Sequence, residues 1–239
     1  MALKGQKVDM PKSAELSERT DMELKTIYVL GAGKGCGNHV AKRFGEEGFR
    51  VVLVSRSKEH LDEYAGEFAD AGIEVHTRVL DVTDFEATTQ ALADLKGEVG
   101  APDVLFCNVG VTSPDSNLRP GAKDAHLLME RYRTDVASAY NAIISIVDDD
   151  FCERRGAILV TGGGFALNPS PAFLPLSMDK AALRAMCLAL HEELKERGVY
   201  VGTVTVTNAI APGSSCDPAL LAEDFWNLYA ERSEAETVR

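Results

Sequence analysis

Short apolar runs rich in β-branched residues alternate along the chain with longer segments whose apolar residues recur at three-and-four spacing. The first pattern is typical of buried strands and the second of amphipathic helices. The predicted strands are residues 26–30, 50–55, 73–80, 103–108, 157–162 and 199–206. This alternation predicts βαβ crossovers, and therefore one α/β domain in which a doubly wound parallel sheet carries helices on both faces.

Two regions lie outside the alternation. Residues 1–24 mix both charges and contain no apolar run long enough for a secretory core or a membrane span, so we expect an N-terminal arm before a single domain over residues 25–239. Near the C-terminus, residues 219–232 have helical periodicity with Phe225, Trp226 and Tyr229 on or near one face. Such an aromatic stripe indicates a core or subunit contact.

Composition narrows the classes of partner. The formal net charge is −12, and the acidic residues are scattered, so no basic face for nucleic acid or for an anionic membrane is evident. The five cysteines are widely spaced without a CxxC pair, and the five histidines fall singly. We therefore expect reduced thiols, a cytoplasmic location and no bound metal.

A glycine-rich turn, 31-GAGKGCG, follows the first predicted strand and precedes a helix. Glycines let a backbone turn sharply and approach a pyrophosphate, and the start of the next helix supplies free N–H groups. The spacing is GxxxGxG through Gly31, Gly35 and Gly37, because Cys36 stands where GxGxxG needs its third glycine. The turn predicts a nucleotide site, although a tight strand-to-helix turn also needs glycine for its own geometry.

From about residue 25 to about residue 215 the sequence resembles the short-chain dehydrogenase/reductase family. The resemblance rests on segments that occur in the family's order, namely 31-GAGKGCG, 81-DVTD, 107-CNVG, 180-KAAL and 208-NAIAPG. It implies a Rossmann-type fold, a dinucleotide cofactor, an apolar or carbonyl-bearing small-molecule substrate, and homodimers or homotetramers assembled through long helices at about 124–150 and 177–197. The cofactor-binding residues that it implies are Gly31, Lys34, Gly35, Cys36, Gly37, Ser55, Arg56, Asp81, Val82, Asn108, Gly110, Lys180, Pro212 and Gly213.

The end of the second strand indicates which dinucleotide is bound. Enzymes that prefer NAD carry a carboxylate there, which accepts from the ribose hydroxyls and repels a 2′-phosphate. Here the position is Ser55, followed by Arg56, and Lys34 adds a second cation in the glycine turn. These residues favour NADP(H) over NAD(H), whereas the alternative is that both cations are ordinary solvated side chains.

The catalytic residues that the resemblance implies are mostly replaced. The family uses a tetrad of Ser, Tyr, Lys and Asn, in which the Tyr transfers a proton and the Lys holds the nicotinamide ribose and lowers the Tyr pKa. Lys180 matches the lysine, but Leu176, Gly163 and Asp135 occupy the Tyr, Ser and Asn positions. Thr161 is the nearest hydroxyl to the Ser position, one or two residues early.

Three hypotheses follow from this pattern. The first is an atypical NADP(H)-dependent oxidoreductase that takes its proton from water, the substrate, Lys180, Asp135 or Asp179, and acts on activated enones or quinones. Its apolar pocket would be lined by Phe165, Leu167, Pro169, Phe173 and Leu176. The second is a catalytically silent NADP(H)-binding protein that acts as a redox sensor or an inactive partner, and the third is a member that no longer binds nucleotide.

Several residues have plainer interpretations beside the functional ones. Asp179 is more often a solvated charge or a capping group than an acid, and Asp135 could hold a water or pair with Arg131 or Arg133 on the surface. After 208-NAIAPG the family usually has a Thr that binds the carboxamide, and Ser214 or Ser215 is the candidate to replace it here.

Overall fold

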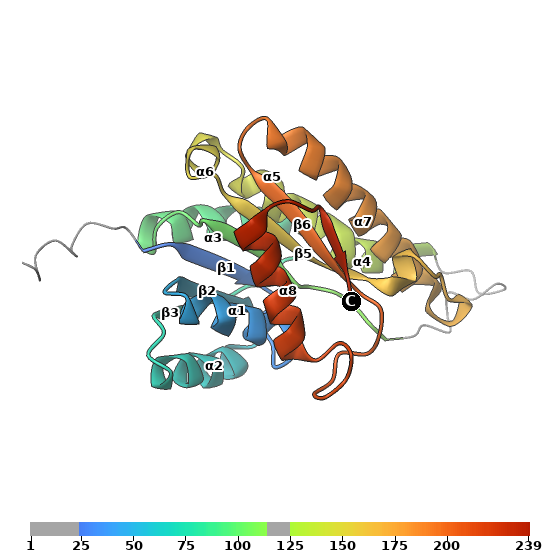
Figure 1. The fold of residues 1–239 in the computed structure, drawn as a ribbon, viewed down its shortest axis with the longest axis horizontal. Coiled ribbons are helices and arrows are strands. Elements are labelled where there is room, and N and C mark those ends of the chain that lie inside the picture. The colour runs from blue at the N-terminus through green and yellow to red at the C-terminus, as the bar shows by residue number, and fades with distance from the viewer. Residues whose placement is uncertain (1–23, 114–124) are drawn as a thin grey trace, which may run out of the picture.

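A computed structural model describes residues 24–113 and 125–239. At its centre is a parallel sheet with the strand order β3-β2-β1-β4-β5-β6-β7 (Figure 1). The strands are β1 (Thr26–Leu30), β2 (Arg50–Ser55), β3 (Val75–Val79), β4 (Val104–Cys107), β5 (Ala157–Gly163), β6 (Tyr200–Val206) and β7 (Glu236–Val238). The prediction of a single Rossmann-type α/β domain is confirmed.

Helices cover both faces of the sheet (Figure 1). One face carries α1 (Cys36–Glu46), α2 (Lys58–Asp70) and α8 (Pro218–Glu231). The other carries α3 (Phe85–Glu98), α4 (Ala125–Tyr132), the π-helix η2 (Arg133–Ala137), α5 (Ser138–Ile146), α6 (Asp149–Glu153) and α7 (Leu174–Lys195). Two 3-10 turns, η3 (Gly164–Ala166) and η4 (Pro171–Phe173), lie between β5 and α7.

Alternation along each strand divides the core into two layers. In β1, Ile27 and Val29 pack in the layer of α1 and α8, whereas Tyr28 and Leu30 pack in the layer of α3, α5 and α7. All four side chains are at most 2% exposed. Complete burial of an aliphatic or aromatic side chain of this size contributes about 1.5–3 kcal/mol, which explains why the central strands are apolar throughout.

Short polar residues fix where the helices begin. Ser57 accepts a hydrogen bond from the backbone N–H of His60 at the start of α2, and Asp84 accepts from Ala87 at the start of α3. Each side chain satisfies an N–H group that has no partner within its helix. Helix α1 begins differently, at Gly35, without a capping side chain.

The aromatic stripe predicted near the C-terminus belongs to the core. On α8, Trp226 and Tyr229 pack edge-to-face on Phe44 of α1, with ring centroids 5.1 and 5.3 Å apart. Phe225 is fully buried against Phe106 of β4. The core alternative is therefore the one that the structure adopts, and α8 is held against α1 by aromatic packing.

The six predicted strands are present, with differences of one or two residues at some ends. Two other features differ from expectation. The helix expected over about 124–150 ends at Ile146 and changes to a π-helix at Arg133–Ala137. The strand β7 was not predicted, and it extends the sheet by pairing with Thr203–Thr205 of β6. The expected N-terminal arm, apart from its last residue, lies outside the described residues.

The sheet topology determines where a ligand would bind. From β1 the chain runs outward through β2 to β3 and then returns to β4 on the other side of β1. The connections at the carboxyl ends of β1 and β4 therefore leave in opposite directions, and such a switch point is where open α/β sheets bind ligands. Within the part of the chain that is described, no helix is long and apolar enough to cross a bilayer.

Candidate functional site

The glycine turn after β1 is packed against the end of β4. Gly31 has a φ of +91°, and a Cβ there would lie 2.9 Å from the backbone carbonyl carbon of Asn108. A Cβ on Gly37 would lie 2.5 Å from the carbonyl oxygen of Gly31. These two glycines are required by the conformation and close packing of the turn itself.

Gly35 has a different reason to be glycine. A Cβ built on it meets no atom within 4 Å, so nothing inside the protein forbids a side chain there. The residue precedes α1, whose first turn has neither a capping side chain nor an acidic residue. Free N–H groups and the positive end of a helix dipole attract a phosphate, so this open cradle fits the pyrophosphate of a dinucleotide.

We expect Gly35→Ala to weaken dinucleotide binding while the protein stays folded, because the added methyl group occupies the cradle without a clash inside the protein. The loss should be at least about tenfold in affinity, which corresponds to about 1.4 kcal/mol. Calorimetric titration with NADPH measures it. Gly66→Ala in α2, where a Cβ also meets no atom within 4 Å, is the matched control, and equal affinity in both variants would contradict the assignment of the cradle.

A hydrogen-bond network ties the glycine turn to β5. The Asn108 side chain donates to the Gly31 carbonyl oxygen at 3.0 Å and accepts from the Thr161 hydroxyl at 2.8 Å. The Thr161 hydroxyl is thus directed at Asn108. Asn108 therefore holds the turn in place, and Thr161 does not offer its hydroxyl proton as the missing serine would.

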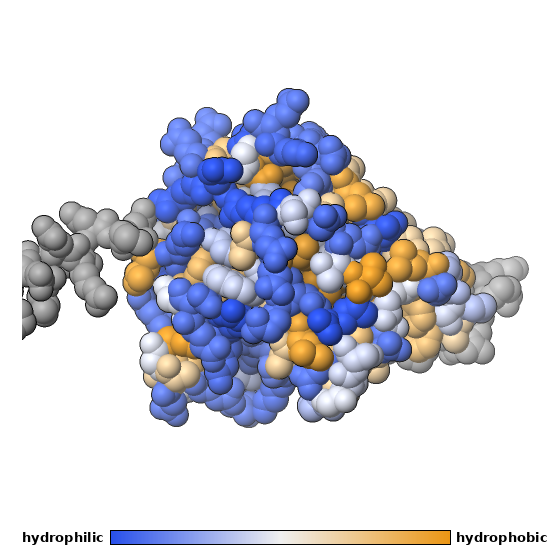
Figure 2. Space-filling model, viewed as in Figure 1, coloured by the Kyte–Doolittle hydropathy of each residue, from blue (hydrophilic) through white to orange (hydrophobic). Residues whose placement is uncertain are grey.

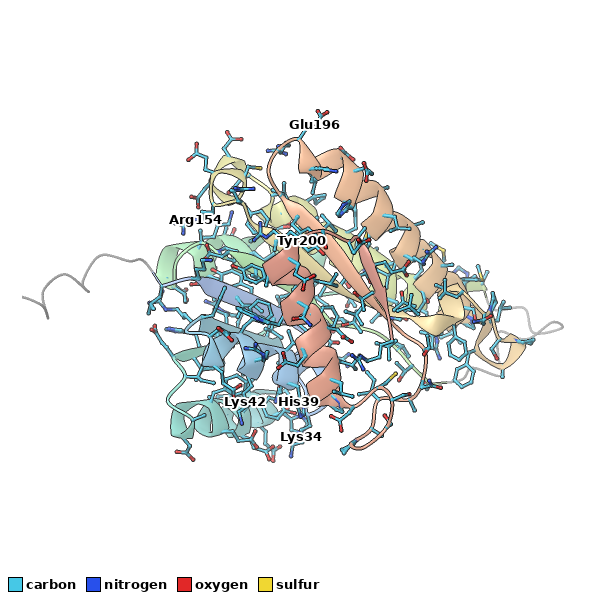
Figure 3. All side chains as sticks on the ribbon, viewed as in Figure 1. Lys34, His39, Lys42, Arg154, Glu196 and Tyr200 are labelled. Atoms are coloured by element: carbon cyan, nitrogen blue, oxygen red, sulfur yellow. The ribbon has the colours of Figure 1, made fainter. Side chains whose placement is uncertain are left out.

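The residues predicted to select the dinucleotide lie after the second and third strands. Arg56 is 4.0 Å from Asp81 and Lys34 is 2.8 Å from Glu63 of α2, and all four side chains are about half exposed or more. Thr83 donates two hydrogen bonds to Asp81, from its backbone N–H and its hydroxyl, and these lower the pKa of that carboxyl. In Figure 3, Lys34 and His39 lie at the edge of the molecule opposite Glu196, which follows α7.

Ser55 and Val82 occupy the positions expected for them beside that edge. Ser55 ends β2, where its carbonyl accepts from Leu80, and Val82 is 7% exposed. Val82 also lines a small cavity beneath the crevice together with Val109, Asp135, Ser138 and Thr161, among other residues. An apolar wall next to the end of the third strand suits the face of an adenine ring.

Lys180 is the best-defined polar group of the site. It is 8% exposed, and its ammonium donates to the Thr161 carbonyl oxygen at 2.9 Å. A Cβ on Gly110 would lie 3.8 Å from its Nζ, so the backbone after β4 runs beside it. Burial lowers its pKa, an effect that Asp135 opposes most strongly. A buried cation at this crevice can donate to hydroxyl groups of a ribose.

The positions expected for the tyrosine and the serine hold no polar side chain. Leu176 is 5% exposed in the first turn of α7. At Gly163 a Cβ would lie 3.0 Å from Cγ and 3.1 Å from Cδ of Lys180. The aliphatic stem of the lysine therefore crosses the space where a serine side chain would start.

Asp135 and Asp179 are both interior. Asp135, in η2, is 1% exposed; its Oδ1 accepts from the Val111 N–H at 2.7 Å, and its Oδ2 has no partner. Asp179 of α7 is fully buried, and neither of its carboxylate oxygens has a hydrogen-bond partner. The surface pairing considered for Asp135 and the solvated or capping role considered for Asp179 are therefore wrong.

Burial dominates the electrostatics of both acids. It raises the pKa of Asp135, against the Val111 hydrogen bond and the charge of Lys180. It raises the pKa of Asp179 to about 7, with the charge of Asp135 as the second cause. Arg131, which is 7% exposed and donates to the Val111 and Ser113 carbonyls, opposes both shifts.

Sequence reasoning named Asp179 but not its burial. The signal was present in the helical spacing, because Leu176, Asp179, Lys180, Leu183 and Cys187 recur at three-and-four spacing, and all five are buried. An acid on the apolar stripe of a helix predicts a buried carboxyl.

The segment after β6 forms a compact turn. Gly213 has a φ of +74°, and its N–H donates to Asp217. The Ser214 hydroxyl donates to the Ala209 carbonyl, and the Ser215 hydroxyl accepts from the Asn208 side chain. Both candidate serines thus hydrogen-bond within their own turn, next to the exposed Pro212.

Apolar residues surround the crevice beside η3 and η4. The Phe165 and Phe173 rings stack with centroids 5.0 Å apart, and Leu167 and Leu174 are each 39% exposed. Figure 2 shows hydrophobic side chains gathered at this end of the molecule, where α7 begins. The five residues expected to line a pocket therefore include a stacked aromatic pair and an exposed leucine.

Comparison with known proteins agrees with this site. Residues 25–215 match the model of the short chain dehydrogenase family, and the chain belongs to that family. A fatty acyl-CoA reductase of Mycobacterium tuberculosis is 30% identical over 225 residues, which span 89% of this chain and 75% of that protein. Serine 3-dehydrogenase of Rhizobium radiobacter is 29% identical over 182 residues, 75% of this chain and 70% of that one.

Solved structures show the same fold. The alcohol dehydrogenase of the archaeon Thermococcus sibiricus, complexed with 5-hydroxy-NADP, superposes with a TM-score of 0.80 at 20% identity, covering 91% of this chain and 96% of that one. Actinorhodin polyketide ketoreductase with NADPH gives a TM-score of 0.81 at 21% identity, covering 90% and 95%. The family is one of oxidoreductases, so the crevice at the switch point is the candidate active site.

Proposed function

We propose that this protein is an NADP(H)-dependent oxidoreductase of the short-chain type that keeps only the lysine of the family's tetrad. The observation that carries the proposal is the buried ammonium of Lys180, which lies beside the backbone of Gly110 and donates to Thr161. Bound NADP(H) would supply the hydride. Lys180 would orient it by donating to the nicotinamide ribose, and the open cradle at Gly35 would hold the pyrophosphate.

The preference for NADP(H) is supported by charge. No carboxylate stands at Ser55, and the neighbouring Arg56 is largely exposed, with Asp81 4.0 Å away. Lys34 pairs with Glu63 on the surface, where ion pairs contribute little and exchange partners readily. A 2′-phosphate offers both cations a stronger partner. The solved relatives whose structures contain NADP or NADPH agree with this preference.

The replaced tetrad limits the chemistry. Leu176 has no proton to transfer, and the Lys180 stem crosses the place of the serine. Loss of a positioned acid costs about a hundredfold to ten-thousandfold in rate, so substrates whose reduction needs little acid catalysis, such as activated enones and quinones, suit the site best. The stacked Phe165 and Phe173 rings favour an apolar substrate, and one relative is named a fatty acyl-CoA reductase.

A second candidate function is a catalytically silent NADP(H)-binding protein that acts as a redox sensor or as an inactive partner. The observation that favours it is the same pair of positions, Leu176 and Gly163, which lack the hydroxyl groups of the tetrad while the cofactor residues remain. The two candidates differ only in turnover.

Assembly and location are also part of the proposal. Exposed apolar side chains lie on the helices through which the family is expected to assemble, namely Met129, Tyr140 and Ile144 on α4 and α5, and Met178 on α7. We propose a homodimer or homotetramer formed through these helices, in the cytoplasm, with a small molecule as substrate and no nucleic acid or membrane as partner.

The test combines binding with turnover. We expect NADPH to bind at least about tenfold more tightly than NADH, which corresponds to about 1.4 kcal/mol, and Arg56→Ala to remove most of that preference. NADPH consumption across aldehydes, ketones, enones and quinones then identifies the substrate class. Turnover limited to enones or quinones supports the oxidoreductase. Binding without turnover supports the silent protein, and no binding of either dinucleotide would refute both.

A further inference from the structure

Three buried ionisable groups meet behind the candidate active site. Asp135 comes from η2, and Asp179 and Lys180 come from α7. The Cβ position of Gly110 lies 3.8 Å from both Asp135 Oδ1 and Lys180 Nζ. Asp135 and Asp179 lie near enough for the charge of one to raise the pKa of the other. The family's tetrad uses neither a carboxyl before the lysine nor one on this helix.

The burial of these acids requires an explanation. An ionised carboxylate without hydrogen bonds in a protein interior costs several kcal/mol. Neither oxygen of Asp179 has a partner, and Asp135 Oδ2 has none either. The two carboxyls therefore avoid the cost by binding a proton between them, as close carboxylate pairs do.

The surrounding charges favour the same state. Lys180 lies on the same helix as Asp179, Asp135 faces it from η2, and Arg131 faces both acids from α4. Burial raises the pKa of the Cys36 and Cys187 thiols to about 12, so these neighbours of Lys180 are neutral. The exchangeable proton nearest to Lys180 is therefore on the acid pair.

We propose that Asp135 and Asp179 hold a proton that reaches the reacting substrate through Lys180 and replaces the proton of the missing tyrosine. This inference rests on the proposed oxidoreductase function. Asp135 and Asp179 act through Lys180 and do not touch the substrate, so they position and supply the proton. The pair explains why η2 carries an acid where the family resemblance expects an asparagine.

The proton transfer is balanced as follows. When the substrate has gained a hydride, its electron-rich atom takes a proton from the Lys180 ammonium, whose N–H electron pair stays on nitrogen. The neutral amine then takes the carboxyl proton of Asp135, and Asp179 passes its own proton to Asp135. Solvent restores the proton through the small cavity that Asp135, Ser138 and Thr161 help to line.

The first readout needs no substrate. Infrared spectra of the apo-protein should show the carbonyl stretch of a protonated carboxylic acid at neutral pH, and this band should disappear as pH rises. Asp179→Asn should abolish the band, whereas Asp62→Asn, an exposed acid paired with Lys58, should leave it. Lys180→Met should move the band's midpoint to higher pH, because a nearby cation is lost. Absence of the band in the wild type would overturn the proposal.

The second readout is the pH profile of turnover with the best substrate of the panel. In the wild type the rate should fall as pH rises through the midpoint of the infrared titration. Asp179→Asn should lower the rate about tenfold to a hundredfold below that midpoint and remove the dependence, with NADPH affinity within twofold of wild type. Asp179→Glu should restore part of both.

The outcomes separate the two proposals. Turnover in Asp179→Asn at the wild-type rate and with the wild-type pH profile would overturn the proton supply and leave the oxidoreductase standing. A wild-type protein that binds NADPH but turns over no substrate would overturn the oxidoreductase and the proton transfer together.

Discussion

Lys180→Met should abolish measurable turnover and weaken NADPH binding about a hundredfold, about 2.7 kcal/mol. The ammonium is 8% exposed and donates to the Thr161 carbonyl oxygen, so it is already desolvated and oriented before a ribose arrives. Hydrogen bonds from a charged donor contribute about 1.5–3 kcal/mol each, and one or two of them to the ribose account for the loss. Methionine keeps most of the stem that packs over Gly163, so the fold should be retained.

The matched control is Lys195→Met, at the exposed end of the same helix. It removes the same charge and should leave NADPH affinity within twofold of wild type. Calorimetric titration of both variants, together with circular dichroism, makes the comparison. Equal affinity in the Lys180 and Lys195 variants would mean that Lys180 does not hold the cofactor.

The sequence predicted the central sheet and the glycine turn because both depend on local chemistry. Runs such as 50–55 are β-branched and apolar at every buried position, and a sharp turn next to Asn108 requires glycine at Gly31. These features are specified by the residues that form them. They could be predicted without knowledge of what packs against them.

The features that were missed depend on distant partners. The strand β7 has three residues and is held by pairing with β6 and by the contacts of Glu236 with Arg184 and Thr205. No local pattern predicts such a strand. The π-helix η2 likewise turns Asp135 into the interior, where it accepts from Val111, and a helical sequence pattern alone does not distinguish this from an exposed position.

The two halves of the site have diverged to different degrees. The half that would hold a dinucleotide keeps Gly31, Gly35, Gly37 and Lys180 in a packed and hydrogen-bonded frame. The half that would hold the reacting group has lost its hydroxyls, while buried acids adjoin the lysine. Buried unpartnered carboxyls lower stability, so their presence favours a role in the reaction over a role in the fold.

Asp179→Asn should make the protein more stable at pH 8 and abolish much of the pH dependence of stability between pH 4 and 7. Burial raises the pKa of Asp179 from 3.8 to about 7. Below about pH 4 both the folded and the unfolded chain bind the proton, so the residue contributes nothing. Between the two pKa values only the folded chain keeps it, so rising pH favours unfolding. Above pH 7 the full penalty, on the order of 3–4 kcal/mol, applies.

Scanning calorimetry at pH 4 and pH 8 measures this effect. A gain of that order corresponds to a Tm increase of roughly 6–16 °C for a chain of this size, seen at pH 8 and small at pH 4. Asp148→Asn is the control with the opposite sign, because the hydrogen bond from Lys96 and the cap on α6 lower the pKa of Asp148. It should lose stability at pH 8. If Asp179→Asn were also less stable than wild type at pH 8, the carboxylate would be a stabilising ion and not a buried acid.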